Sequence, residues 1–249
     1  MSLMEPEFVP IDRDAAFPFA CDPEVPCFNQ CCRDLNQILY PYDILRLCRH
    51  MDWPSDRFLE QYTWTHDGPR TGLPVVGLRF DPARDLACPF VTAEGCRVYT
   101  DRPAACRLYP LARAVTGPDL DGGIREHFAL LREPHCQGHG AGVSQKVSEW
   151  IDSQGLYDYH RMNDPMIALI RLRRQRPGAL SSGVRRRVRT ALYDPDGFRR
   201  HLLASPKDDP LTPSAAERAQ LAEDDEALIG FAFRWVKILL GAEPDRETP

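Results

Sequence analysis

The sequence predicts a mainly helical α+β fold, in which an irregular cysteine-rich metal-binding core with a few short strands is followed by a helical C-terminal extension. Eight of the nine cysteines fall into two groups before residue 140, the stretches between them are short and bounded by glycine and proline, and the pattern becomes helical beyond Ser144. We therefore expect a cysteine-cluster metal-binding domain over residues 15–165 and a helical C-terminal extension over residues 166–249.

The composition is that of an ordinary globular chain. Of 249 residues, 43% are hydrophobic and 27% are charged, so the chain can build a core without metal. Residues 1–10 lack the basic and apolar pattern of a signal peptide, and the longest apolar stretch, Ala227–Leu240, is too short and too interrupted by charge to span a bilayer. We expect a cytoplasmic protein without membrane contact.

The N-terminal part contains a leader, a strand and two helices. Residues 1–20 are rich in proline and phenylalanine and predict an irregular leader. Residues 35–40 are apolar enough to predict a short strand, and Pro41 suits the start of a helix whose pattern runs over Asp43–Met51. A second helix is expected after Ser55.

The middle of the chain predicts two further strands and a short helix. Leu73–Phe80 reads as a strand at a sheet edge or at the opening of a hairpin, because Pro74 and Gly77 weaken a central position. A short helix is expected over residues 103–110, between two prolines, and a strand over Ile124–Arg132.

The C-terminal part is predicted to be helical. The region Ser205–Pro213, with its three prolines, suits a linker or exposed turn, and Ala215–Leu240 is the best candidate for a single helix.

The cysteines carry the strongest chemical signal. Four thiolates complete a tetrahedral zinc shell or ligate one iron–sulfur cluster, and in a reducing compartment dense cysteine spacing indicates metal or redox chemistry rather than disulfides. The eight candidate metal ligands form a first group, Cys21, Cys27, Cys31 and Cys32, and a second group, Cys88, Cys96 and Cys106 followed by Cys136.

Two other interpretations of the cysteines stay open, namely buried free thiols and a dithiol redox switch formed by Cys31 and Cys32. Successive side chains of an extended segment point to opposite faces, so this vicinal pair serves one site only if the turn is irregular, or else faces two metals. Cys48 lies in a stretch with helical periodicity, where we expect a small buried apolar residue outside the site.

The arrangement resembles the YkgJ-type cysteine-cluster family, also described as a zinc- or iron-chelating domain. The resemblance covers about residues 19–160 and implies that all eight cysteines are candidate ligands, with zinc or an iron–sulfur cluster as the occupant. Flagellin lysine methylases share this cysteine pattern, and that likeness implies a [4Fe–4S] cluster. The first group departs from the commoner C-x2-C-x2-C-C form. The residues that carry the resemblance are Phe19–Arg33, Tyr40–Leu47, Cys88–Phe90, Gly95–Tyr99, Arg102–Pro103, Cys106–Pro110, Cys136 and Gly138.

Several residues near the cysteines have bland and functional interpretations. His135 and His139 flank Cys136 and are expected to belong to a polar loop rather than to bind zinc. Tyr99 and Tyr109 are expected to pack around the site and exclude water, and the glycine-rich residues 138–142 predict a flexible loop. Arginines next to the cysteines are expected to balance thiolate charge, with hydrogen bonds to sulfur, and these are Arg33, Arg97, Arg102 and Arg107.

The arginine runs within residues 171–189 are read mainly as solvated helix faces, and nucleic-acid binding is not expected because the whole chain carries a net charge of −5. Contact with the acidic residues 223–226, or with a partner, is an alternative.

Three function classes stay open. They are an iron–sulfur centre supporting redox chemistry or modification of another protein, a structural-zinc module that binds a protein partner, and a lysine-methylase-like enzyme. The sequence names no catalytic residue and leaves the oligomeric state undetermined.

Overall fold

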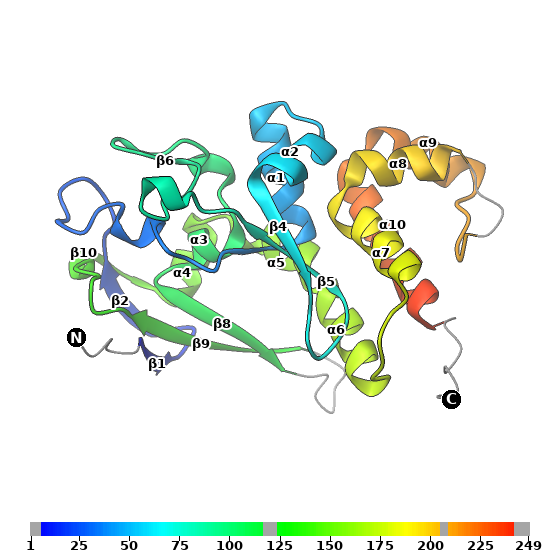
Figure 1. The fold of residues 1–249 in the computed structure, drawn as a ribbon. Coiled ribbons are helices and arrows are strands. Elements are labelled where there is room, and N and C mark those ends of the chain that lie inside the picture. Colours follow the sequence, from blue (N-terminus) through cyan, green and yellow to red (C-terminus); the bar gives the residue numbers. More distant parts are fainter. Residues whose placement is uncertain (1–5, 117–123, 205–208, 242–249) are drawn as a thin grey trace. The chain divides into compact units, whose positions relative to one another are not determined.

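The fold is α+β and mainly helical, as predicted. The computed structural model describes residues 6–116, 124–204 and 209–241 (Figure 1). The chain packs into two compact units, the first formed by Met1–Gln37 and Phe80–Asp158 and the second by Ile38–Arg79 and Tyr159–Pro249. These units interleave along the sequence, and the limits 15–165 and 166–249 stay a prediction about sequence segments.

The first unit contains three antiparallel pairings. One is a three-stranded sheet in the order β1-β9-β8, and the others are the pairs β2-β10 and β6-β7. The strand predicted over residues 124–132 is confirmed as the central strand β9. The strands are β1 (Glu7–Ile11), β2 (Ala16–Phe19), β6 (Val91–Thr92), β7 (Gly95–Cys96), β8 (Leu111–Thr116), β9 (Arg125–Arg132) and β10 (His139–Lys146).

The prediction of an irregular leader is wrong for the described residues 6–20, because this segment contains β1 and β2. Each strand includes a proline, Pro10 in β1 and Pro18 in β2. Each of these strands is hydrogen-bonded to only one neighbouring strand. The backbone on its other side needs no N–H donor, so a proline, which lacks the N–H, is tolerated. The leader's first five residues lie outside the described residues.

The prediction of a flexible glycine-rich loop is also wrong, since residues 139–142 belong to β10. Gly140 and Gly142 have φ values of +84° and +75°, and the register with β2 shifts between His139 and Ser144. Glycine reaches positive φ without steric cost, so it suits a bulge of this kind.

Short helices of the first unit pack against the β2-β10 pair. The indole ring of Trp150 meets Phe17 and Phe19 edge-on, with ring centroids 5.9 and 5.8 Å apart, and its N–H donates to the carbonyl of Leu108 at 3.2 Å. The helices predicted over residues 103–110 and beyond Ser144 are confirmed. The helices of the first unit are η1 (Gln30–Cys32), η2 (Pro82–Arg84), η3 (Tyr99–Asp101), α3 (Ala104–Leu108) and α4 (Val147–Ser153). The next helix, α5 (Leu156–Asn163), begins in the first unit and ends in the second.

The second unit places helices around α10, whose residues Leu228, Phe231 and Trp235 are buried. The predicted first and second helices are confirmed as α1 and α2. No helix within the described ranges is long and apolar enough to cross a membrane. The elements are β3 (Ile38–Leu39), α1 (Pro41–Met51), α2 (Ser55–Tyr62), β4 (Thr63–Asp67), β5 (Pro74–Leu78), α6 (Pro165–Gln175), α7 (Ser182–Tyr193), α8 (Pro195–Leu203), α9 (Ala215–Glu223) and α10 (Asp225–Gly241).

The predicted edge position of β5 is wrong, because β5 is the central strand in the order β3-β5-β4. Pro74 is tolerated because it is the first residue of the strand, opposite Asp67. Gly77 lies opposite Trp64, and a Cβ built on Gly77 would stand 2.2 Å from the indole ring. The glycine therefore makes room for the tryptophan.

The single tail helix predicted over Ala215–Leu240 is two helices, α9 and α10, separated at Asp224. The Asp224 side chain accepts hydrogen bonds from the backbone N–H groups of Glu226 and Ala227, both at 3.0 Å, and so caps α10. In the predicted linker, residues 205–208 lie outside the described residues, and 209–213 form no helix or strand.

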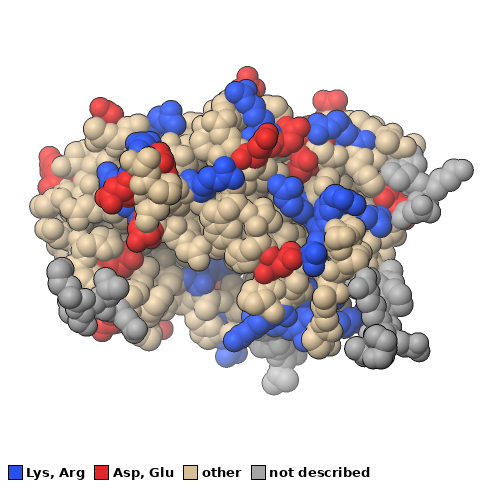
Figure 2. All heavy atoms as spheres, viewed as in Figure 1, with Lys and Arg blue, Asp and Glu red and all other residues tan. Residues whose placement is uncertain are grey.

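The arginine runs form part of the surface of the second unit, and Figure 2 shows basic side chains gathered over α7. Arg185 pairs with Asp67 at 3.3 Å, and Arg187 pairs with Asp209 at 3.4 Å. In the acidic tail, Asp225 instead pairs with Arg49 at 2.7 Å. These ion pairs link α7 to Asp67 and Asp209 rather than to the acidic tail. The solvated-face prediction is wrong for Arg173, however, because this side chain is 5% exposed and donates to the carbonyls of Thr71 and Gly178.

Substitution Gly77→Ala is predicted to destabilise the protein. The added methyl group must displace the Trp64 ring in a packed sheet, which costs about 1–3 kcal/mol. Denaturant unfolding measures the change. Gly230→Ala is the matched control, because nothing lies within 4 Å of a Cβ there, and it should stabilise α10 by about 0.5–1 kcal/mol. Equal effects of the two changes would contradict the packing argument.

Candidate metal centre

Backbone pairing brings together two loops that are far apart in the sequence. β2 and β10 run antiparallel with Phe19 opposite His139, and the N–H of Ala20 donates to the carbonyl of Gly138 at 3.2 Å. Paired strands lie about 4.8 Å apart. The loop that follows β2 and the loop that precedes β10 must therefore lie side by side, and both carry cysteines.

Thiol contacts join these loops. The thiol of Cys21 donates a hydrogen bond to Cys31, and the Cys31 thiol donates to its neighbour Cys32. Cys136, from the loop before β10, lies close enough to Cys31 to raise its pKa by charge repulsion. The irregular turn that would let both members of the vicinal pair act together is provided by the 3-10 helix η1.

The backbone N–H of Gln137 donates to Cys27 Sγ at 3.1 Å, so Cys27 also lies against the loop of Cys136. Although Cys136 was assigned to the second group in the sequence, in the structure it lies beside the first group. We call this set the five-cysteine group, and it consists of Cys21, Cys27, Cys31, Cys32 and Cys136.

The remaining ligand candidates, Cys88, Cys96 and Cys106, are called the three-cysteine group. The β6-β7 hairpin places Cys96 opposite Val91, and Cys88 and Cys96 are close enough for their charges to interact. Backbone N–H groups of Phe90 and Val91 donate to the Cys88 sulfur. Cys106 lies on α3 and is exposed.

The two groups are neighbours within the first unit. The N–H of Cys88 donates to the carbonyl of Cys32 at 2.9 Å. The Arg102 guanidinium, between the groups, exerts a favourable charge effect on the Cys21 and Cys96 thiolates and interacts with Cys106. The eight predicted ligand candidates therefore occupy one region of one unit.

Cys48 lies in α1 of the second unit and is 5% exposed. Burial raises the pKa of its thiol, and the carboxylates of Asp196 and Asp194 raise it further. The expectation of a buried residue at this position is confirmed.

The sulfur atoms are gathered but do not form a closed ligand shell. All nine cysteines are free thiols. Among the described residues, no three side chains of His, Cys, Asp or Glu converge in a way that could hold a metal ion. The chemistry of the donor set nevertheless fits a metal that prefers thiolates, because eight thiols are clustered and several sulfurs already accept backbone N–H bonds.

The thiols of Cys31, Cys88 and Cys96 favour the protonated state when no cation neutralises them. The hydrogen bond from Cys21 lowers the pKa of Cys31, but the bond to Cys32 and burial outweigh it and bring the value to about 12. Burial raises the pKa of Cys88 to about 11, although the Phe90 N–H opposes the change. Burial likewise raises the pKa of Cys96.

The neighbouring arginines donate hydrogen bonds to backbone carbonyls. Arg33 donates to the carbonyl of Arg84 at 3.1 Å, and Arg97 donates to that of Pro89 at 3.1 Å. Arg107 donates to the carbonyl of Gln154 at 2.7 Å. In these three bonds the acceptor is a backbone oxygen instead of the predicted sulfur, and the arginines fix the loops that carry the cysteines.

Three further side chains near the cysteines either differ from their predicted role or were not predicted. Tyr99 is 58% exposed and stacks on Arg102 at 3.8 Å, so the prediction that it shields the site is wrong. Gln37 is buried, and its Oε1 lies 3.5 Å from Cys106 Sγ. Gln154 accepts from Arg102 through its side chain. The two glutamines belong to no ligand motif, so no sequence signal points to them.

The histidines that flank Cys136 have other contacts. His135 Nε2 lies 3.7 Å from a Glu133 carboxylate oxygen. His139 Nε2 lies 3.0 Å from the carbonyl oxygen of Leu131, and burial lowers the pKa of its ring. His135 lies in a loop, as predicted, but His139 is the first residue of β10, so the polar-loop prediction is wrong for His139.

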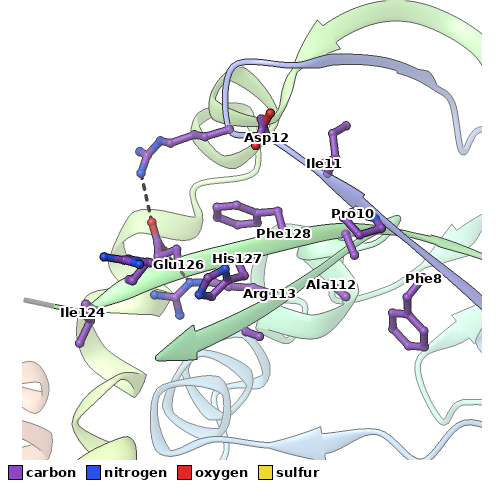
Figure 3. A pocket seen from close by; sticks show the side chains of 14 residues that line it. Phe8, Pro10, Ile11, Asp12, Ala112, Arg113, Ile124, Glu126, His127 and Phe128 are labelled. Atoms are coloured by element: carbon purple, nitrogen blue, oxygen red, sulfur yellow. Dashed lines mark hydrogen bonds and ion pairs between the residues drawn. The ribbon is translucent and has the colours of Figure 1, made fainter. Parts of the chain in front are cut away.

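A separate hollow lies on the sheet of β1, β8 and β9 and contains no cysteine (Figure 3). Its volume is 1020 Å³, and the Arg13 guanidinium approaches the Glu126 carboxylate at 3.1 Å. Arg113 bonds the other oxygen of Glu126 at 2.6 Å. Two guanidinium groups therefore hold the Glu126 carboxylate at this hollow.

Residues 20–137 match the family model CxxCxxCC, described as a putative zinc- or iron-chelating domain. The match covers 118 of the 249 residues, just under half of the chain, and it agrees with the resemblance seen in the sequence. No curated protein and no solved structure matches the chain. Metal binding is therefore the function that both the cysteine arrangement and the family support.

The protein is predicted to bind its metal more weakly as the pH is lowered. A thiol must lose its proton to become a ligand, and the raised pKa values of Cys31 (about 12) and Cys88 (about 11) mean that protons compete strongly at neutral pH. Lowering the pH from about 8 to about 6 should weaken metal binding, and loading in weakly buffered solution should release protons. Competition with a chelator measures the first effect and pH recording the second. Retention that does not vary over this range would contradict the prediction.

Proposed function

We propose that the first unit is a metal-binding module in which cysteine thiolates hold the metal, with the five-cysteine group as the primary site. The observation that carries this proposal is the β2-β10 pairing, which brings Cys136 to the loop of Cys21–Cys32. Five sulfurs are enough for one complete set of four thiolates. The three-cysteine group supplies further candidate ligands beside it.

A [4Fe–4S] cluster is the occupant that we favour. The donor set offers sulfur in preference to oxygen or imidazole, and Cys88 precedes Pro89, a dipeptide found at the end of some iron–sulfur motifs. The likeness of the cysteine pattern to flagellin lysine methylases supports the same choice. Zinc is the alternative, since a four-thiolate set suits it equally well.

The residues of the chain suggest how such a centre would be supported. N–H donors at Cys27 and Cys88 stabilise thiolate charge, and Arg102 lowers the electrostatic cost of gathering several thiolates. When bound, an iron–sulfur cluster would supply one-electron chemistry, whereas zinc would serve as a structural cross-link between the loops. We further propose a reducing, cytoplasmic setting and a protein substrate or partner for this centre.

Anaerobic purification followed by metal and sulfide analysis separates the two occupants. An iron–sulfur protein should be brown, with iron and acid-labile sulfide in similar amounts. Colourless protein with stoichiometric zinc would replace the cluster by zinc while leaving thiolate binding in place. Calorimetry with S-adenosylmethionine tests the methylase-like alternative, which a clean absence of binding would remove.

The metal content of single Cys→Ser variants is predicted to depend on which of the two units carries the substituted cysteine. Cys136→Ser should weaken metal binding by at least about tenfold, because it removes a proposed ligand. Cys48→Ser is the control, since it should keep full metal content despite a stability cost of about 1–3 kcal/mol for burying a hydroxyl. Metal content is measured after gel filtration against a chelator. If Cys48→Ser lost the metal and Cys136→Ser kept it, the assignment would be wrong.

A further inference from the structure

The hydroxyl group of Tyr109 has no hydrogen-bond partner of normal geometry, although its oxygen atom is buried. Burying a hydroxyl without a partner costs roughly 1–3 kcal/mol, so an orphaned group of this kind calls for an explanation. One explanation is that its acceptor exists in a different chemical state of the protein.

Contacts of the ring and backbone fix where this hydroxyl lies. The ring packs edge-on against Phe19 with centroids 5.7 Å apart, and the carbonyl of the next residue, Pro110, accepts from the N–H of Leu131 at 2.8 Å. Phe19 is the last residue of β2, and Leu131 is close to the end of β9. Tyr109 therefore stands where the loops that carry the five-cysteine group begin.

The two groups that act on the hydroxyl belong to the loop after β9. Burial is the largest cause that raises the pKa of Tyr109, and Cys136 and then Glu133 raise it further. The N–H of Cys136 donates to the carbonyl of Glu133 at 2.9 Å, which turns this loop back toward the tyrosine. A neutral thiol is a weak acceptor, whereas a thiolate accepts strongly.

We propose that the Tyr109 hydroxyl donates a hydrogen bond to the Cys136 sulfur when that sulfur is a thiolate ligand. This inference rests on the proposed function, because it concerns one of the proposed ligands. Tyr109 is then a positioning residue that orients the sulfur and spreads its charge. The bond slows metal loss, and in an iron–sulfur centre it raises the reduction potential.

The variant Tyr109→Phe in the full chain tests the proposal. In the loaded protein, transfer of metal to a chelator should become about 10–100-fold faster, the usual effect of losing a bond that supports a ligand. In the metal-free protein, the variant should unfold at the same or slightly higher denaturant concentration, because it removes an unpaired buried hydroxyl. Tyr99→Phe is the matched control, since that ring is exposed and stacks on Arg102, and its metal transfer should equal the wild type.

The same comparison in a Glu133→Gln background identifies the acceptor. If the sulfur accepts the bond, Tyr109→Phe should speed metal transfer as much as before. Loss of the effect in that background would make Glu133 the acceptor and overturn the proposal.

Other outcomes separate this proposal from the proposed function. Equal transfer rates in wild type and Tyr109→Phe would overturn the role of Tyr109 while thiolate binding stands. Wild-type protein that takes up no metal would overturn both. Equal destabilisation of the metal-free and loaded forms would show that the hydroxyl only supports the fold, and would also overturn the proposal.

Discussion

The antiparallel pairing of β2 with β10 is the constraint on which the candidate site depends. It places Phe19 opposite His139 and joins Ala20 to Gly138 by a backbone hydrogen bond. Cys136 is separated by more than a hundred residues from the first cysteine group, and closing so long a loop is entropically costly. The strand ladder offsets this cost, because its backbone hydrogen bonds hold the two cysteine-bearing loops together.

The same strand pair requires a glycine and an aromatic residue at its end. A Cβ on Gly138 would lie 2.3 Å from the carbonyl oxygen of Ala20 and 2.8 Å from the Phe19 ring. Phe19 in turn contacts Tyr109, His139 and Trp150. Close backbone approach and aromatic packing therefore occur at one place, and they fix the loops that carry the cysteines.

Gathering thiols has an electrostatic cost that shapes the chemistry of the site. Burial is the main cause that raises the pKa values of Cys88 and Cys96, and hydrogen bonds donated to other thiols together with burial raise those of Cys21 and Cys31. Repulsion by a neighbouring thiolate adds to the increase at Cys21, Cys31 and Cys88. Arg102 and the backbone N–H donors offset only part of this cost. A bound cation reverses the balance, because it stabilises the deprotonated form of every sulfur that it contacts.

The sequence by itself determined the donor chemistry, the mainly helical α+β class, and most local elements, because cysteine spacing, proline positions and helical periodicity are local signals. It also separated Cys48 from the eight candidate ligands. Only the tertiary structure decided that Cys136 lies with Cys31, that β5 is a central strand, and that the hydroxyl of Tyr109 is buried beside Cys136. These outcomes depend on strand pairing and on the space left by Gly77 and Gly138, which are contacts between distant residues that no local pattern records.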